Sequence, residues 1–289
     1  KLLAECAAYR NGFQAPTLPE YLCEWASVRY GVTAFDSDNG KYQTKVDLRT
    51  ALIYNIGEND HLSFAIGQYS QNPEDYKQVE NFGNPDIVDQ QAIHYVFHYD
   101  HQFENDYMLE VEPYYKEYKN LAIEDAVSQF LNEGRGQANG VDITIKKRSD
   151  DLYLYATYTY VDSERQTSTK STKQHTFYLE TPHTLQVAAS YNHSENIVPS
   201  VLVQYHTGTP YTPITGTNDF PYNDQTLKVP IYGTPFSKRL PSYFTLNLKL
   251  AYIENISTSE QIEFSFELMN ATNHENVQDI RYDDDYKIE

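Results

Sequence analysis

The residues of this sequence that could do chemistry include nine scattered histidines, of which His94 and His98 are the most suggestive pair. On a helix, imidazoles four residues apart can bind one metal ion. We place this pair on a strand instead, where residues four apart share a face at a separation of roughly 13 Å. Because that distance is too great for one ion, we expect both histidines to be polar residues of a sheet face.

Carboxylates form a second candidate site near the end of the chain. Asp283, Asp284 and Asp285, with Glu289 following, could supply the oxygen ligands that calcium prefers. The ligand spacing and central glycine of an EF-hand loop are absent. We therefore interpret this run as a solvated loop and predict no metal site.

Motifs of the common enzyme classes are missing from the sequence. It contains no GxSxG nucleophile elbow, no Walker lysine loop, no HExxH and no CxxC. We therefore predict no catalytic residues, no cofactor and no enzyme activity.

Aromatic residues of the segment 209–241 are the candidates for ligand binding. Such rings could stack on a sugar, a catechol or a porphyrin. They could equally pack the segment against itself or form an aromatic band at a membrane surface. The candidate ligand-binding residues are Tyr211, Tyr222, Tyr232 and Phe236.

The composition narrows the class of protein. The chain has 289 residues, 22 of them basic and 41 acidic, which gives a net charge of -19 and argues against a nucleic-acid partner. Its 27 tyrosines and 40% hydrophobic content favour a folded, strand-rich protein. No apolar run approaches the roughly 20 residues of a membrane helix. A membrane barrel stays open as a fold, because its strands hide their apolar face by alternation.

Alternation of apolar and polar residues is the strongest structural signal. In residues 242–252 and 260–269, side chains alternate with the period of a strand. The polar positions carry many charges, which suits strands with one face toward lipid and the other toward a wet lumen. The candidate lumen-facing residues are Lys45, Asp47, Arg49, His94, His98, Glu110, Glu112, Lys116, Lys249, Glu263 and Glu267.

Connection lengths support an antiparallel up-and-down transmembrane β-barrel, an all-β fold. Short turns alternate with longer loops at 72–90, 120–137, 163–182 and 209–241, which is typical of an outer-membrane barrel with tight periplasmic turns. A twelfth strand could begin near Ile280. The expected strands are 26–34, 43–54, 60–71, 91–101, 106–119, 138–148, 151–162, 183–192, 197–208, 242–253 and 260–271.

The first 25 residues lack this regularity, so we expect an irregular segment at 1–25 and barrel strands over 26–289. Cys6 and Cys23 in this segment could form one disulfide or remain two free thiols. We see no signal peptide at the start of the chain.

Seven segments in order resemble the TonB-dependent receptors of the outer membrane. Thr207-Gly208-Thr209-Pro210-Tyr211-Thr212-Pro213-Ile214 is similar to the family's "sG.PyTPi" motif, and Arg239-Leu240-Pro241 begins its "RLP.Y" motif. The remaining resemblances lie at 67–73, 83–95, 114–121, 134–142 and 267–273.

The resemblance implies a 22-stranded barrel closed by an N-terminal plug. It also implies import of a scarce ligand, driven by proton motive force through the TonB complex. That ligand could be an iron-siderophore, haem, a metal, cobalamin or an oligosaccharide. The 11–12 strands expected here are about half of such a barrel, so we expect a partial chain. The plug and the TonB-engaging segment would then be outside it, and the barrel's outer surface would contact outer-membrane lipid. The alternatives are a passive porin or, less favoured, a surface adhesin or enzyme on a barrel scaffold.

Overall fold

The computed structural model describes residues 26–36, 42–81, 83–125, 129–166, 168–170, 172–194, 196–222, 225–257, 259–283, 286 and 288. Within the strands, side chains are described from Asp47 onward, except those of Asp125, Gln129, Tyr222 and Gln225. The predictions for segment 1–25, Cys6, Cys23, Asp284, Asp285 and Glu289 lie outside the described residues, as do the side chains of Lys45 and Tyr222.

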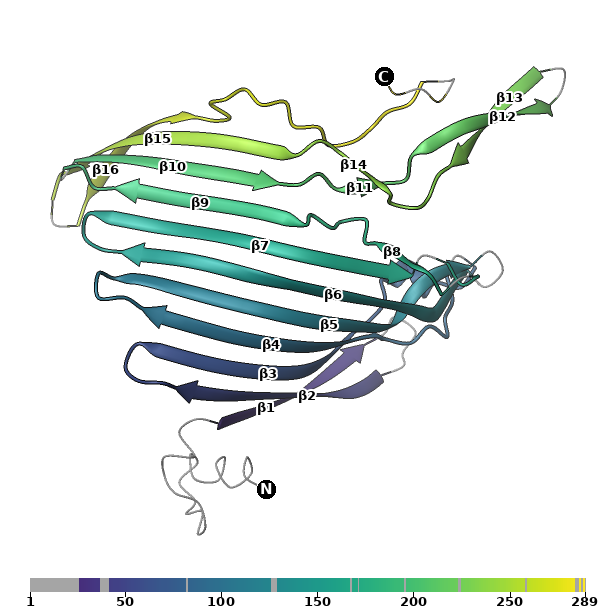
Figure 1. Ribbon diagram of the computed structural model, residues 1–289, viewed down its shortest axis with the longest axis horizontal. Helices are drawn as coiled ribbons and strands as arrows, with labels where there is room; N and C mark the ends of the chain where they lie inside the picture. Colours follow the sequence, from purple (N-terminus) through teal and green to yellow (C-terminus); the bar gives the residue numbers. More distant parts are fainter. Residues whose placement is uncertain are drawn as a thin grey trace, which may run out of the picture. The chain divides into compact units, whose positions relative to one another are not determined.

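Antiparallel strands in chain order make up almost the whole described structure (Figure 1), which confirms the all-β prediction. They form a twelve-stranded sheet in which each long strand pairs with the next, β8 (Gln174–Thr176) pairs with β7, and β10 pairs with β15. The long strands are β1 (Ala26–Asp36), β2 (Tyr42–Asn55), β3 (Asp60–Gln71), β4 (Gln90–Gln102), β5 (Tyr107–Asp125), β6 (Gln129–Arg148), β7 (Leu152–Gln166), β9 (His183–Tyr191), β10 (Ile197–His206), β15 (Tyr243–Asn255) and β16 (Gln261–Leu268).

The order of pairing runs from β1 to β16 without closing on itself. A single 3₁₀ turn, η1 (Asp75–Lys77), is the helical element among the described residues. No helix in this described part is long and apolar enough to cross a membrane.

The sheet belongs to two compact units. The first takes in the described residues up to Phe103 together with Leu109–Val141 and Ser163–Gln174. The second takes in Glu104–Met108, Asp142–Asp162 and the described residues from His175 onward. β6 and β7 each contribute residues to both units.

Each unit has one polar and one apolar face, because successive side chains of a strand point to opposite sides. In the first unit, the register sets Arg49 opposite Gly67 and Gly67 opposite His94, whereas Leu52 lies opposite Phe64 on the other side. In the second unit, Lys249 faces Glu267 on the polar side and Leu250 faces Phe266 on the apolar side. Phe266 is 70% exposed, as expected for a face that packs against lipid.

The β5–β6 hairpin corrects the loop predicted over 120–137. The two strands continue to Asp125 and from Gln129, well past the expected ends. Leu121 and Ile123 are buried there, and a Cβ added at Gly134 would lie 2.5 Å from the Leu121 carbonyl oxygen. The pairing therefore continues beyond the expected ends, and Leu121 and Ile123 are buried on one side of this extension.

The segment 209–241, predicted as a loop, also contains short strands. β11 (Pro210–Tyr211) pairs with β14 (Lys238–Arg239), and β12 (Ile214–Tyr222) pairs with β13 (Gln225–Tyr232). Figure 1 shows the β12–β13 hairpin in green beyond the ends of β10 and β15. A twelfth long strand near Ile280 is wrong for the described residues, where only an isolated bridge joins Tyr282 to Ile288.

Candidate functional site

Three basic side chains of the first unit line up across neighbouring strands on the polar face. The Arg49 guanidinium carbon lies 4.4 Å from the centre of the Tyr69 ring, and that ring lies 4.3 Å from the ring of His94. Lys116 and Arg49 both interact electrostatically with His94. Lys116 Nζ lies 4.3 Å over the Tyr114 ring. We call Arg49, His94 and Lys116, with the tyrosines beneath them, the basic row.

Gly67 makes room for this arrangement. It lies opposite both Arg49 and His94 in the strand register. A Cβ at this position would lie 3.0 Å from Tyr69 Cε2 and 3.2 Å from Arg49 Cγ. The missing side chain therefore lets the Tyr69 ring and the Arg49 stem lie against the sheet, where their cation–π contact contributes about 0.5–1 kcal/mol.

Asp47, predicted as a lumen-facing residue, has a side chain that its neighbours enclose. Its side chain is 2% exposed. Its two carboxylate oxygens accept hydrogen bonds from the Ser70 backbone N–H at 3.1 Å and the Ser70 hydroxyl at 2.9 Å. Arg49 Nη2 lies 3.9 Å from the same carboxylate. Ser70 supplies the hydrogen bonds to Asp47, and the Arg49 guanidinium meets this carboxylate only at a long ion-pair distance.

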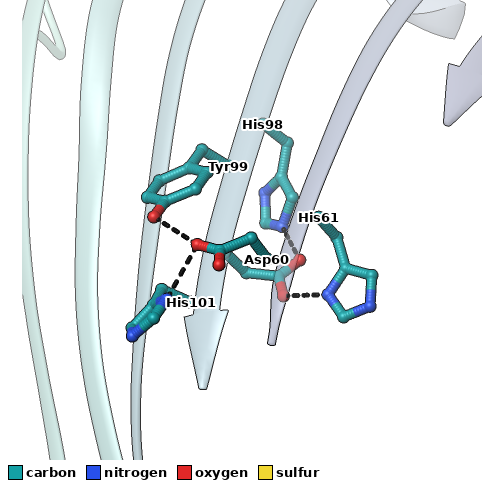
Figure 2. A network of polar contacts seen from close by, with 6 residues as sticks. Asp60, His61, His98, Tyr99 and His101 are labelled. Carbon is teal, nitrogen blue, oxygen red and sulfur yellow. Dashed lines mark hydrogen bonds and ion pairs between the residues drawn. The ribbon is translucent and has the colours of Figure 1, made fainter. Parts of the chain in front are cut away.

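Nearer the short-turn end, the polar face carries a chain of alternating histidines and carboxylates. His61 Nδ1 lies 2.8 Å from Asp100 Oδ2, and His98 Nε2 lies 3.3 Å from Asp100 Oδ1 (Figure 2). His98 Nδ1 lies 3.3 Å from Glu112 Oε2. The structure thus brings together His98 and Glu112, while Glu110 lies two residues away on β5, half-buried.

Sequence reasoning missed His61 and Asp100 of this chain. Their pairing depends on the register of β3 against β4, which sets them opposite one another. On the other face of the same strands, Asp60 accepts a hydrogen bond from Tyr99 at 2.7 Å and lies 2.8 Å from His101 Nδ1. Figure 2 shows this second group beside the first.

The predicted charges of the second unit also meet. Lys249 Nζ lies 2.7 Å from Glu263 Oε1 and 3.8 Å from Glu267 Oε1. All three side chains are substantially exposed, so the interactions are weak contributors to stability.

Arg239 ties the base of segment 209–241 to the preceding loop. Its Nη1 donates to the carbonyl oxygens of Glu180 at 3.0 Å and Gly208 at 3.3 Å, and its Nη2 donates to Glu180 Oε1 at 2.7 Å. Glu180 is buried. A Cβ at Gly208 would lie 1.8 Å from the Leu240 carbonyl oxygen, so only glycine fits this crossing. Arg239 and Gly208 lie in two of the motifs noted above, yet their contact was not predicted.

The three aromatic candidates whose side chains are described, Tyr211, Tyr232 and Phe236, lie in β11, in β13 and in the connection before β14. Phe236 has a φ of 54° and lies 6.3 Å from the ring of Tyr178 in the preceding loop. Tyr211 is half-buried in β11, and Tyr232 is 65% exposed at the end of β13. Among the described side chains, no ring contact joins Tyr211, Tyr232 and Phe236. Their role in ligand binding stays a prediction.

A polar hollow of about 890 Å³ opens at the long-loop end of the first unit. It lies between the β5–β6 hairpin and the segment that follows β7. Its lining consists of Lys119, Asn120, Asn132, Glu133, Gly134, Arg135, Gln166, Thr169, Thr172 and Gln174.

Metal ligands do not cluster in the described part of the chain. No group of three or more histidine, cysteine, aspartate or glutamate side chains there has an arrangement that could hold an ion.

Comparison with known families gives one match over most of the chain. The family model described as "TonB dependent receptor-like, beta-barrel" matches residues 7–271. No curated protein matches the chain in sequence.

Solved structures match the fold at low sequence identity. The ferric-catecholate import receptor Fiu of Escherichia coli K12 has a TM-score of 0.62 at 13% identity, over 86% of this chain and 33% of its own. The ferripyoverdine receptor of Pseudomonas aeruginosa has a TM-score of 0.60 at 10% identity, over 86% and 32%. The outer-membrane transporter YddB of Escherichia coli has a TM-score of 0.62 at 10% identity, over 86% and 39%. This chain therefore spans 32–39% of the length of these three structures.

Proposed function

Because this chain belongs to the TonB-dependent receptor-like β-barrel family and lies in the outer membrane of a Gram-negative bacterium, we propose that it is part of an importer of an anionic iron chelate. In this proposal the polar face lines the path of the ligand and the apolar face contacts lipid. The TonB complex would supply energy through residues outside this chain.

The basic row is the observation that carries the proposal. The chain has almost twice as many acidic as basic residues, yet Arg49, His94 and Lys116 lie together on one face. Arg49 and Lys116 rest on tyrosine rings, which leaves their charge available to a passing anion. Many ferric chelates carry net negative charge, and the two cations Arg49 and Lys116 on a water-filled wall would attract them.

The named neighbours support iron as the cargo. Fiu is described as a ferric-catecholate import receptor, and the Pseudomonas protein as a ferripyoverdine receptor. We extend this cargo class to the present chain because its polar face carries cations suited to the same chemistry. A passive porin would need neither these cations nor an energy source.

Uptake of radioactive ferric chelates tests this function in cells that make the intact receptor and no siderophore of their own. We expect uptake to stop when TonB is deleted or a protonophore is added. The double variant Arg49→Glu/Lys116→Glu should import several-fold more slowly at an equal surface level, whereas the matched reversal Lys238→Glu should import normally. Uptake that continues unchanged without TonB would overturn the proposal and favour a porin.

A further inference from the structure

The polar hollow of the first unit has the size of a small-molecule site. Its volume of about 890 Å³ lies within the range of roughly 300–1,000 Å³ that ligand pockets occupy. It sits at the long-loop end of β5 and β6, which faces the exterior in an outer-membrane barrel. A ligand arriving from outside would therefore meet this hollow before it met the basic row.

Hydrogen bonds fix the wall of the hollow. Asn132 Nδ2 donates to the carbonyl oxygens of Val88 at 2.8 Å and Asn120 at 3.0 Å, and Asn132 Oδ1 accepts from the Val88 backbone N–H. This one side chain ties β6 both to β5 and to the loop before β4. The wall is thus built before any ligand binds, which lowers the entropy cost of binding.

Two glycines close the back of the hollow. A Cβ at Gly134 would lie 2.5 Å from the Leu121 carbonyl oxygen, and a Cβ at Gly136 would lie 2.8 Å from the Glu164 carbonyl oxygen. The backbones of β5, β6 and β7 approach closely at these points. The side chains around the opening, Arg135 and Lys119, project from this tight framework and are exposed.

The chemistry of the lining is hydrophilic and favours an anion. Within the lining, Lys119 and Arg135 supply two positive charges against the one negative charge of Glu133, and Lys119 Nζ also lies 3.9 Å from Glu117 Oε2 beside the hollow. The other lining residues offer amides, hydroxyls and one glycine, and none is aromatic. Gln174 Oε1 is shielded from solvent and accepts no hydrogen bond within the described structure, so it can accept one from a ligand.

We propose that this hollow is the entry site of the receptor and that it selects hydroxycarboxylate chelates of iron over tris-catecholate chelates. The inference rests on the proposed function and assigns its substrate class. Lys119 and Arg135 pair with ligand carboxylates, and Gln174 accepts from a ligand hydroxyl or amide. A catechol, which proteins usually hold by stacking on aromatic side chains, finds no ring in this lining.

Binding of three probes to the purified intact receptor tests the inference. The probes are ferric citrate, ferrioxamine and a ferric tris-catecholate, titrated by calorimetry. We expect ferric citrate to bind at least about 10-fold more tightly than the tris-catecholate and also more tightly than ferrioxamine, which offers no carboxylate to Lys119 and Arg135. The double variant Lys119→Glu/Arg135→Glu should weaken the binding of ferric citrate by about 10- to 100-fold. This is the range expected for the loss of charge-assisted hydrogen bonds.

Two further variants separate chemistry from folding. Gln174→Met keeps the size of the side chain and removes its acceptor, so it should weaken the binding of ferric citrate by several-fold. Lys170→Glu makes the same charge change in the same segment outside the lining and should bind as the parent does. Heat-dependent gel mobility reports whether each variant forms a folded barrel.

The outcomes distinguish this inference from the proposed function. If the tris-catecholate binds most tightly and the lining variants bind every probe normally, the selectivity is overturned while TonB-dependent uptake stands. If the receptor neither binds nor imports any iron chelate, both proposals fail.

Discussion

Arg239 donates hydrogen bonds to both the carboxylate and the backbone carbonyl of Glu180, which lies 59 positions earlier in the sequence. The carboxylate is buried, whereas the guanidinium is one-third exposed. A lysine could keep the charge but not the fork of parallel donors that this contact uses. The contact therefore depends on arginine, and it holds the base of the longest connection in the second unit.

Replacing Arg239 should loosen two loops at once. We expect Arg239→Lys to lose about 1–3 kcal/mol of local stability, because the buried Glu180 carboxylate is left with a poorer partner. Amide exchange should accelerate in residues 177–181 and 207–212. Lys238→Ala, which removes an exposed neighbouring side chain, is the control and should exchange like the parent. Equal protection in the Arg239 variant would show that the loops are held by other contacts.

Tyr69 supports Arg49 through its ring and not through its hydroxyl. We expect Tyr69→Phe to import iron chelate at the parental rate, because the cation–π contact needs only the aromatic face. Tyr69→Ala should slow import, because the Arg49 guanidinium loses the surface on which it rests. Transport assays at matched receptor levels make the comparison. Equal import rates for Tyr69→Phe and Tyr69→Ala would show that the Tyr69 ring does not support the function of Arg49.

Acid should loosen the loop between β3 and β4. Lys77 donates to Glu74 at 2.7 Å and thereby holds the pKa of the Glu74 carboxyl below its ordinary value of 4.5. A lowered folded-state pKa means that the pair stabilises the loop above the ordinary value and loses this contribution as the pH falls through the lowered one. Exchange in residues 74–84 should therefore increase below about pH 4. Lys77→Met should remove this pH dependence and exchange faster at neutral pH.

The two faces of β15 and β16 should respond oppositely to charge. Leu250→Arg places a cation on the apolar face and should lower the free energy of unfolding by about 2–4 kcal/mol if the site lies near the middle of the bilayer. Ser265→Arg adds the same side chain to the polar face and should cost much less. Folding of the intact receptor into lipid vesicles, followed with increasing urea, measures both. Similar costs for the two variants would contradict the assignment of the faces.

Much of the fold could be predicted from the sequence because lipid imposes a strict alternation on each strand. β15 and β16 were predicted to within three residues at each end from this pattern alone. The outer parts of β5 and β6 were missed because their apolar period is short, with Leu121 and Ile123 as its buried members. The β12–β13 hairpin was missed because Gly216, Pro221 and Pro230 interrupt its strands and are typical of loops.

The candidate site was predictable only as single residues. Periodicity placed Arg49 and His94 on one face, but their approach through Tyr69 depends on the cross-strand register and on Gly67. His61 and Asp100 meet for the same reason, and Arg239 meets Glu180 through a loop crossing. These contacts depend on the pairing between strands or on the crossing of loops, and the residue pattern within one strand does not predict them.

The pairing order has a consequence for how the chain folds. Most neighbouring strands are joined by a connection of a few residues, but β10 and β15 are separated by the whole of segment 207–242. Closing that loop spans about three doublings of length relative to a short turn, at about 0.6 kcal/mol for each doubling. The β10–β15 junction should therefore be the slow step of zippering in the second unit, and it is where an assembly chaperone would have most time to act.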